Sequence, residues 1–304
     1  MYVVVPGPDE VSRSFAKSLA DSIKGSLCEP AYKQFPDGEQ YMRLTCDVKG
    51  ADVIYVKTML PSQDSSLVLS ALAADSARSS GAERVTLVAP YMAYARQDRQ
   101  FLPGEPVSIR SVLRALWAAG FSHMATVEMH KPDSLRQFPG ASVNVRPYVF
   151  MAEVLGIRGS NYVVLSPDLG ALERAKMLAE HLKVPYDYIE KERDRITGQV
   201  TMKVKQLDVS GRDVIIVDDI ISTGGTVSKA AEILRDQGAR SVTVIVAHAV
   251  LAPGAEERLR SAGINNVFAA NTTPAQGSFV RQVDVAPLVA RELAGIMGVS
   301  NNEQ

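Results

Sequence analysis

Residues 213–226 read DVIIVDDIISTGGT and carry three structural signals in succession. Residues 214–217 are all β-branched and apolar, which is typical of a buried strand. Gly224 and Gly225 then predict a turn, and residues 227–234 (VSKAAEIL) have the apolar spacing of a helix. A strand, a glycine turn and a helix in this order indicate an α/β protein with a largely parallel sheet.

The same alternation recurs along the chain. Residues 85–89 (VTLVA) predict another strand, and residues 170–179 (GALERAKMLA) have a helical pattern. Strands that alternate with helices favour a mainly parallel sheet with helices on both faces. We therefore expect the α/β fold class throughout.

The order of these pieces is repeated, which indicates a duplication. Three pairs of segments match at offsets of 161, 157 and 160 residues: 52–56 with 213–217, 81–89 with 238–246, and 3–8 with 163–168. Chance similarity within an α/β protein is the alternative, but three matches at nearly one offset favour two copies. We expect an N-terminal domain at residues 1–147 and a C-terminal domain at 148–304, a size usual for single domains.

Composition excludes several functional classes. The 33 basic and 34 acidic residues nearly cancel, so the sequence predicts no nucleic-acid partner. No apolar run reaches transmembrane length and no leader precedes residue 2, so we expect a cytoplasmic protein without a membrane partner. Cys28 and Cys46 lack metal-ligand spacing, and we expect both to be small buried side chains in a reducing compartment.

The segment that follows residue 217 predicts a site for a sugar phosphate. Ligands of open α/β sheets bind beyond the carboxyl ends of strands, where Asp218 and Asp219 could accept sugar hydroxyls. Residues 222–226 (STGGT) would then offer backbone N–H groups and hydroxyls to a phosphate at a helix N-terminus. A strand end, turn and helix cap would explain the glycines but not the acidic pair. The first copy has KTMLPS at 57–62, without adjacent acids or a glycine pair.

Residues 217–226 resemble the phosphoribosyl diphosphate loop of type I phosphoribosyltransferases and of the related ribose-phosphate diphosphokinases. The resemblance implies two duplicated type I phosphoribosyltransferase-like domains, of which the second holds ribose 5-phosphate. The residues that it assigns to ribose 5-phosphate are Asp218, Asp219, Ser222, Thr223, Gly224, Gly225 and Thr226.

A second segment, YMAYARQDRQ at 91–100, distinguishes the two families. Arginine can pair with phosphate oxygens or stack on a base, although a solvated charged loop is an alternative. The segment resembles the nucleotide loop of ribose-phosphate diphosphokinases, which simple phosphoribosyltransferases lack. It therefore assigns Arg96, Gln97, Asp98 and Arg99 to ATP.

Three shorter matches extend this resemblance. Residues 35–39 (FPDGE) read as a turn by themselves. The family match implies that Phe35 stacks on the adenine of ATP, while Asp37 and Glu39 contact the base across a subunit interface. Residues 126–130 (TVEMH) predict a strand that ends in a histidine, which could be structural. By resemblance His130 contacts Mg²⁺, and Asp168 in the turn SPDLG reaches a metal or the ribose.

Residues 190–198 (EKERDRITG), between two predicted strands, could be an exposed hairpin tip. In the family, a lysine followed two positions later by an arginine closes over the triphosphate, and Lys191 and Arg193 keep that spacing. The resemblance thus makes them catalytic. Acidic residues replace more basic ones of some relatives here, which leaves the role of Arg195 open.

Together these matches imply a Mg²⁺-dependent ribose-phosphate diphosphokinase, which makes phosphoribosyl diphosphate and AMP from ribose 5-phosphate and ATP. The resemblance also implies a homo-oligomer built from dimers. A phosphoribosyltransferase is one alternative, but it explains neither the duplication nor residues 91–100. A non-catalytic regulatory homologue is another, and it should have lost the motifs that stand here.

Overall fold

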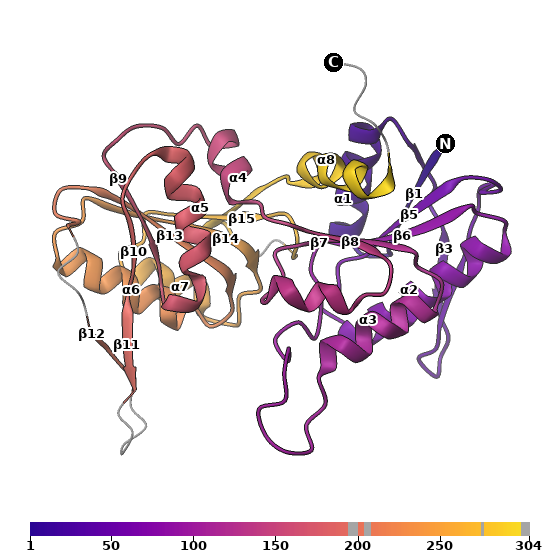
Figure 1. Ribbon diagram of the computed structural model, residues 1–304, viewed down its shortest axis with the longest axis horizontal. Helices are drawn as coiled ribbons and strands as arrows, with labels where there is room; N and C mark the ends of the chain where they lie inside the picture. Colours follow the sequence, from indigo (N-terminus) through magenta and orange to yellow (C-terminus); the bar gives the residue numbers. More distant parts are fainter. Residues whose placement is uncertain (194–199, 204–207, 275–276, 299–304) are drawn as a thin grey trace. The chain divides into compact units, whose positions relative to one another are not determined.

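A computed structural model describes residues 1–193, 200–203, 208–274 and 277–298, and for residues 190–193 and 200–203 it describes the backbone only. The chain forms two compact units. The first comprises Met1–Arg146, Asn271–Pro274 and Asp284–Gln304, and the second comprises Pro147–Ala270 and Ala275–Val283. Each unit has its own sheet (Figure 1). Each also has its own hydrophobic core.

The first unit contains a six-stranded sheet in the order β2-β1-β5-β6-β7-β8, in which all neighbours are parallel. Its strands are β1 (Tyr2–Pro6), β2 (Ser26–Leu27), β5 (Asp52–Val56), β6 (Arg84–Ala89), β7 (His123–Val127) and β8 (Ala141–Val145). Helices cover both faces, with one pair on each (Figure 1): α1 (Glu10–Ile23) with α8 (Ala286–Met297), and α2 (Gln63–Ser79) with α3 (Ser108–Ala118). A 3₁₀ helix, η1 (Pro132–Gln137), follows β7.

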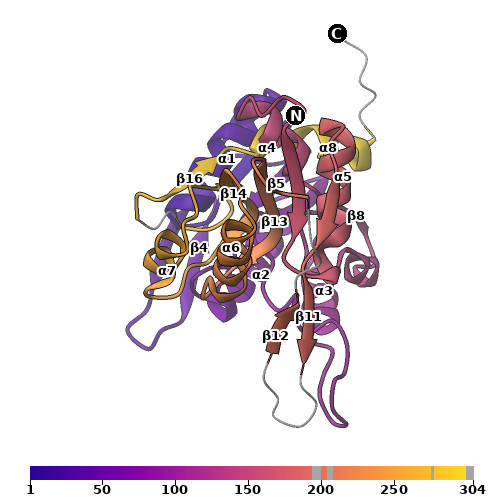
Figure 2. The ribbon, with the colours of Figure 1, turned by 90° about the vertical axis from the view of Figure 1, so that its left-hand side faces the viewer.

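The second unit has the order β10-β9-β13-β14-β15-β16, again with parallel neighbours throughout. Its strands are β9 (Tyr162–Ser166), β10 (Tyr186–Tyr188), β13 (Asp213–Ile221), β14 (Ser241–Ala249), β15 (Asn266–Ala270) and β16 (Val280–Val283). Helix α5 (Leu172–Leu182) lies on one face of this sheet, and helices α6 (Gly225–Asp236) and α7 (Ala255–Ser261) lie on the other (Figure 2). The short elements η2 (Leu169–Ala171) and α4 (Tyr148–Val154) precede and contact α5.

The two strand orders are the same, position by position, which confirms the predicted fold class. The matched segments of the sequence form equivalent strands, since β1 corresponds to β9, β5 to β13, and β6 to β14. One edge strand of each sheet is also followed by an antiparallel hairpin: β3 (Ala31–Gln34) with β4 (Gln40–Arg43) after β2, and β11 (Glu190–Arg193) with β12 (Val200–Lys203) after β10. The duplication therefore includes a hairpin in each unit.

Strand β13 is longer than predicted. The β-branched residues 214–217 are buried, as the pattern required, but the expectation that the strand ends there was wrong. Strand β14 is equally long and pairs Asp218 with Val246 and Ile220 with His248. The acidic pair therefore belongs to a rigid strand, and the loop begins only after Ile221.

Helix α6 packs on this sheet through a single apolar stripe. Its buried residues include Val227, Ala230, Ala231 and Leu234, whose spacing of three, four and seven places them on one face. Complete burial of a leucine contributes about 1.5–3 kcal/mol to stability. The stripe fixes the orientation of the helix and thereby the position of its N-terminus beside the end of β13.

Two helices each follow the last strand of one unit in the chain but belong to the other unit. Helix α4 follows β8 in the chain but is part of the second unit, where it contacts α5 and β14. Helix α8 follows β16 but is part of the first unit, where it contacts α1, β7 and β8. Among the described residues, no helix combines the length and the apolar character needed to cross a membrane.

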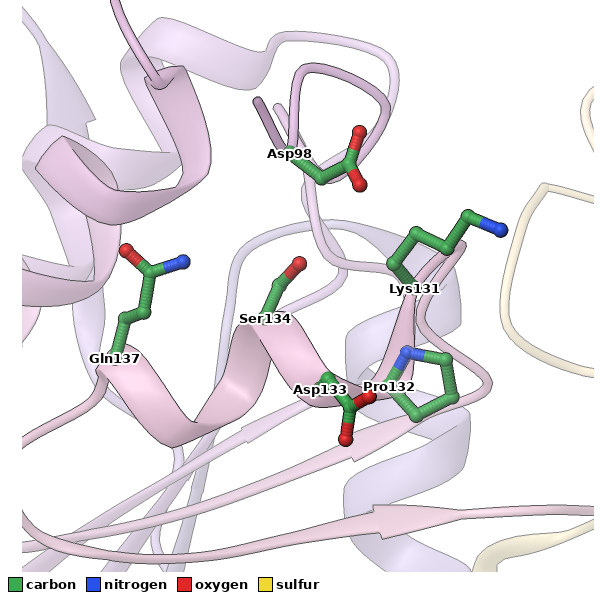
Figure 3. A pocket seen from close by; sticks show the side chains of 6 residues that line it. All are labelled: Asp98, Lys131, Pro132, Asp133, Ser134 and Gln137. Atoms are coloured by element: carbon green, nitrogen blue, oxygen red, sulfur yellow. The ribbon is translucent and has the colours of Figure 1, made fainter. Parts of the chain in front are cut away.

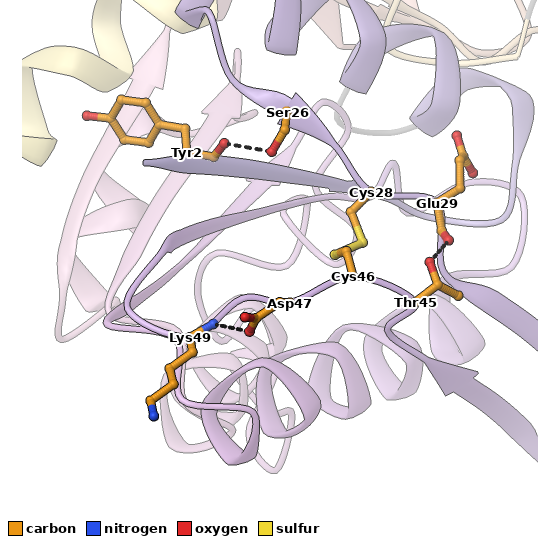
Figure 4. The surroundings of a disulfide bond; sticks show 8 residues. All are labelled: Tyr2, Ser26, Cys28, Glu29, Thr45, Cys46, Asp47 and Lys49. Carbon is orange, nitrogen blue, oxygen red and sulfur yellow. Dashed lines mark hydrogen bonds between the residues drawn. A yellow bond between two sulfur atoms is a disulfide. The ribbon is translucent and has the colours of Figure 1, made fainter.

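Cys28 and Cys46 are not separate buried thiols, so that expectation was wrong. They form a disulfide at the base of the β3–β4 hairpin (Figure 4). The residues are 18 apart in the chain, but the hairpin returns the backbone to the edge of the sheet and brings their Cα atoms within 6.1 Å. Beside them, the Thr45 hydroxyl donates to the Glu29 carbonyl at 2.6 Å, which further ties the two ends of the hairpin together.

Candidate functional site

The acidic pair lies at the carboxyl end of β13. Asp219 is buried with 6 % of its surface exposed, whereas Asp218 is half-buried. The backbone N–H of Asp219 donates to Oδ1 of Asp218 at 2.9 Å, and the Tyr148 hydroxyl donates to the Asp218 carbonyl oxygen at 3.2 Å. Burial, together with the negative charge of Asp219, raises the pKa of the Asp218 carboxyl. The pair thus forms a fixed, electron-rich edge that can accept hydroxyl hydrogens or bind a cation.

The connection from β13 to α6 has the geometry of an anion site. Gly224 is the N-cap of α6 and has a φ of 74°, in the left-handed region that favours glycine. The helix begins at Gly225, so the free N–H groups of its first turn follow directly. Thr223 and Thr226 are exposed and Ser222 is half-buried, which leaves hydroxyls available to a ligand. The dipole and the N–H groups of such a helix end favour a phosphate.

Helix α7 and the segment before it support this connection through hydrogen bonds. Nη1 of Arg258 donates to the Thr223 carbonyl oxygen at 2.8 Å, and the N–H of Ala252 donates to the Ser222 carbonyl oxygen at 2.9 Å. These contacts use carbonyl groups of the loop and leave its N–H groups to a ligand. The loop is therefore held before a ligand arrives.

Asp168 follows strand β9, the direct neighbour of β13 in the sheet. The Ser166 hydroxyl donates to the Asp168 carbonyl oxygen at 2.8 Å and fixes the turn. Because neighbouring parallel strands end at the same edge, the half-buried Asp168 and the acidic pair belong to one edge of the sheet. The structure therefore brings together the ligand residues predicted in the second half: Asp168, Asp218, Asp219 and residues 222–226.

A buried arginine connects these two segments. Arg174 of α5 has 7 % of its surface exposed, and its Nη2 lies 3.7 Å from Oδ2 of Asp219. Its Nη1 lies 3.5 Å from the carbonyl oxygen of Gly170, in the turn after Asp168. The sequence analysis did not single out this residue, because an arginine in a charged helical pattern reads as solvent-exposed.

In the first unit, the segment with Arg96 and Arg99 connects β6 to α3. The Ser108 hydroxyl of α3 donates to the side-chain carbonyl of Gln97, and the Arg99 guanidinium lies 4.9 Å from the Phe101 ring centroid. Asp98 lines a cavity of about 290 Å³. The other lining residues come from the segment after β7 (Figure 3): Lys131, Pro132, Asp133, Ser134 and Gln137.

His130 directly precedes Lys131, one of the residues that line this cavity. The prediction that the strand extends to His130 was wrong, because β7 ends at Val127 and the buried Glu128 has a φ of 35°. A side-chain contact fixes the turn, since the Met129 N–H donates to Oδ1 of Asn144 at 2.7 Å. A positive φ at a buried non-glycine residue marks backbone strain of the kind found at functional sites. His130 is half-buried at the end of this turn.

The predicted turn at residues 35–39 closes the β3–β4 hairpin. The N–H of Phe35 donates to the Glu39 carbonyl oxygen at 2.8 Å, and the N–H of Glu39 donates to Oδ1 of Asp37. Phe35 is 37 % exposed, with Nζ of Lys33 4.5 Å from its ring centroid and the edge-on ring of Tyr41 at 6.1 Å. An exposed aromatic ring beside a cation is suited to stack on a base.

Lys191 and Arg193 lie on strand β11, and their side chains are outside the described part of the structure. Arg195 lies outside the described residues altogether.

Across the described ranges, the structure contains no group of three or more His, Cys, Asp and Glu side chains that could hold a metal ion by themselves. Mg²⁺ does not require such a group, since it often takes one or two carboxylates and completes its shell with water and substrate phosphates.

The equivalent strand end in the first unit is occupied by an ion pair. Lys57, directly after β5, donates from Nζ to Oδ2 of Asp9 at 2.7 Å and to the Thr58 carbonyl oxygen at 2.6 Å. Its side chain is 5 % exposed. A lysine whose hydrogen bonds are used internally replaces the acidic pair, so this copy lacks the hydroxyl-accepting edge of the second unit.

Comparisons with known proteins match the chain over both halves. A family model described as the N-terminal domain of ribose phosphate pyrophosphokinase matches residues 9–120, and one described as the phosphoribosyl transferase domain matches residues 150–287. The chain is 41 % identical over 300 residues to a ribose-phosphate pyrophosphokinase of Aeropyrum pernix, with 97 % of each chain covered. It is 40 % identical to that of Methanopyrus kandleri, with 93 % of this chain and 96 % of the relative covered.

One solved structure resembles nearly the whole chain. The phosphoribosylpyrophosphate synthetase of Mycobacterium smegmatis aligns with a TM-score of 0.87 and 27 % identity, covering 98 % of this chain and 99 % of that one. The likeness therefore extends over both units and their connections.

Proposed function

Because the chain belongs to the ribose-phosphate pyrophosphokinase family, whose members are also called diphosphokinases, we propose that it transfers the β,γ-diphosphoryl group of ATP to ribose 5-phosphate. The products are 5-phosphoribosyl 1-diphosphate, a precursor for nucleotide biosynthesis, and AMP. The observation that carries this proposal is the edge formed by β9, β13 and α6, where an acidic pair lies beside a preformed anion loop.

The second unit binds ribose 5-phosphate in this proposal. The carboxylates of Asp218 and Asp219 accept the ribose hydroxyls, and residues 222–226 hold the 5-phosphate at the start of α6. A phosphoribosyltransferase would use the same loop, but full-length similarity to ribose-phosphate pyrophosphokinases favours synthesis of the diphosphate over its consumption.

The nucleotide belongs to residues of the first unit. Arginine side chains bind the triphosphate or stack on adenine, and the exposed Phe35 ring stacks on the base. The full set proposed for ATP comprises Phe35, Asp37, Glu39, Arg96, Gln97, Asp98 and Arg99.

The reaction requires positioning and charge neutralisation more than covalent chemistry from the protein. The anomeric oxygen forms a bond to the β-phosphorus as the bond from that phosphorus to the α,β-bridging oxygen breaks. AMP leaves with the bond electrons, and the hydroxyl proton is released. Lys191 and Arg193 stabilise the negative charge on the transferring group.

Mg²⁺ fits the oxygen-rich donors of this chain. Asp168 and the acidic pair offer carboxylate oxygens, the ligands that Mg²⁺ prefers, and His130 is a further proposed ligand. The bound ion would neutralise phosphate charge. We also propose that the protein acts in the cytoplasm as a homo-oligomer built from dimers. Light scattering of the purified protein measures the size of the oligomer.

The test of the proposed function is direct. Purified protein is incubated with ribose 5-phosphate, ATP and Mg²⁺, and the products are separated by anion exchange. AMP and phosphoribosyl diphosphate should appear in equal amounts. ADP as the nucleotide product would mean transfer of a single phosphoryl group and would contradict the proposal, as would the absence of turnover.

A further inference from the structure

The guanidinium of Arg174 is buried beside a residue proposed to bind the ribose. Its side chain is 9 % exposed and that of Asp219 is 8 % exposed, so the pair is shielded from solvent. Arginine is almost never this buried without a partner. Removing one member of a buried ion pair leaves the other charge uncompensated, which disturbs the position of the remaining side chain.

The same guanidinium contacts the turn that carries Asp168. Its Nη1 lies 3.5 Å from the carbonyl oxygen of Gly170, while its Nη2 lies toward Asp219. The carboxylate of Asp168 also lies against Gly170, where an added Cβ would be 3.1 Å from Oδ1. A planar guanidinium can contact a carbonyl and a carboxylate at once, which the single ammonium of a lysine does less well.

The orientation of Asp219 is transmitted to Asp218 through the backbone. The N–H of Asp219 donates to Oδ1 of Asp218, so a change in the Asp219 peptide would turn the Asp218 carboxylate. The Tyr148 hydroxyl donates to the carbonyl oxygen of Asp218, in the peptide between the two aspartates, at 3.2 Å. The whole acidic edge therefore has one orientation, which depends on the contacts made by Asp219.

We propose that Arg174 is a positioning residue, which holds the carboxylates of Asp219 and Asp218 in the orientation that receives the hydroxyls of ribose 5-phosphate. The inference rests on the proposed function. Arg174 does not touch the substrate. It fixes the acidic edge to the Asp168 turn, so that both segments meet the sugar in a single arrangement.

The experiment measures KM for each substrate in Arg174→Met and Arg174→Lys. Methionine fills the space without a charge, and the KM for ribose 5-phosphate should rise roughly ten- to a hundredfold, as for a lost charged hydrogen-bond partner. Lysine keeps the charge and should give a smaller rise, of a few-fold. The KM for ATP should change by less than about threefold in both variants, since the nucleotide is bound elsewhere.

The control is Arg240→Met. Arg240 donates to Asp213 at the amino end of the same strand, with Nε 2.9 Å from Oδ1. Like Arg174→Met, this variant removes an arginine that contacts an aspartate of β13. Asp213 lies at the opposite end of the strand from the proposed site, so both KM values should stay at the wild-type level.

Equal increases of both KM values in Arg174→Met would show a merely structural role and overturn the inference. If Arg174→Met does not fold, Arg174→Lys decides, and wild-type kinetics in that variant also overturn it. Failure of the proposed function is distinguishable, because the wild-type protein would then make no AMP.

Discussion

At the scale of single residues, two aspartates of β13, Asp213 at its first position and Asp218 near its carboxyl end, have opposite electrostatic environments. Burial and the charge of Asp219 raise the pKa of Asp218, whereas the hydrogen bond from Arg240 lowers the pKa of Asp213. Asp218 therefore reduces the stability of the folded protein when it is ionised, and Asp213 increases it. Functional sites often contain residues that reduce stability, which agrees with the proposed role of Asp218 in binding the ribose.

Asp218→Asn should therefore stabilise the protein at neutral pH while it abolishes activity. The unfolded chain ionises this group near the ordinary aspartate pKa of about 3.9, but the folded protein does so only at higher pH. The destabilising contribution is absent below the unfolded pKa, grows as the pH rises, and is complete above the folded pKa. Thermal melts of the variant and the wild type should thus diverge as pH increases from 4 to 8.

Asp213→Asn is the matched control and should behave in the opposite way. Its stabilising contribution is present above the unfolded pKa and disappears as the pH falls through the lowered folded pKa. The pair with Arg240 lies at the surface, so the loss at neutral pH should be small. A melting temperature of Asp218→Asn at or below that of the wild type at pH 8 would contradict the account of Asp218.

Lys191→Ala should reduce kcat by roughly 100- to 1000-fold, as when one group that stabilises transition-state charge is removed. Binding of ribose 5-phosphate, measured by calorimetry, should stay nearly intact because its proposed ligands lie elsewhere in the second unit. Lys49→Ala, a change of an exposed lysine in the first unit, serves as the control. Turnover in Lys191→Ala within a few-fold of the control would refute the catalytic role.

At the scale of elements, two helices begin with a glycine in the left-handed region. Gly224 caps α6 with a φ of 74°, and Gly254 caps α7 with a φ of 77°. Only the first belongs to the proposed phosphate loop. Substitutions at the two glycines can therefore distinguish the effect of backbone strain on stability from the effect of a damaged phosphate loop on substrate binding.

Gly224→Ala should destabilise the protein by about 1 kcal/mol and raise the KM for ribose 5-phosphate, because a strained loop no longer presents its N–H groups correctly. The added Cβ would also contact Leu259 at 3.4 Å. Gly254→Ala meets nothing within 4 Å and should cost similar stability without a change of KM. Urea denaturation and steady-state kinetics on both variants provide the comparison, and a similar rise of KM in both would argue against the loop assignment.

The hairpin β3–β4 is closed at its base by the only two cysteines of the chain. Reduction with dithiothreitol should destabilise the protein by about 3 kcal/mol, as expected when a constraint on a loop of this length is lost. It should also raise the KM for ATP and leave that for ribose 5-phosphate unchanged, because the hairpin carries Phe35, Asp37 and Glu39. The doubly substituted Cys28→Ser/Cys46→Ser protein should not respond to the reductant. An unchanged KM for ATP after reduction would show that the disulfide does not support nucleotide binding.

The sequence predicted those strands and helix ends that depend on residues close together in the chain. The apolar run at 53–56 and the β-branched run at 214–217 form the buried parts of β5 and β13, which are equivalent strands of the two sheets. The glycine pair began a helix as expected. The extension of β13 to Ile221 depends on the length of β14, a partner 20 residues away in sequence. The disulfide and the burial of Arg174 likewise depend on segments brought together only by folding.

At the scale of the whole molecule, one fold is used twice with different residues at equivalent strand ends. The second unit has Asp218 and Asp219 after the apolar core of β13, and the first unit has Lys57 paired with Asp9 after β5. The hairpins differ in the same way, since one carries the residues proposed for adenine and the other carries Lys191 and Arg193. The same architecture thus carries different side chains at equivalent positions, which agrees with the proposal of one substrate in each unit.

This asymmetry predicts where ribose 5-phosphate protects the backbone. Hydrogen exchange should slow at residues 220–227 when the sugar phosphate is added, and should stay unchanged at the equivalent residues 59–66. The internal pairing of Lys57 is the physical reason, because it leaves no acidic edge for the ribose. Equal protection of both segments would mean that the first copy has kept a sugar-phosphate site.

The helices α4 and α8 make the two halves of the chain dependent on each other. A fragment that ends at Arg146 would lack α8, whose buried side chains Leu288, Val289, Leu293 and Met297 cover the first sheet beside α1. That face would then be bare and would promote aggregation. A single proteolytic cut between the two halves therefore cannot yield a complete first unit, because α8 belongs to that unit but follows the strands of the second.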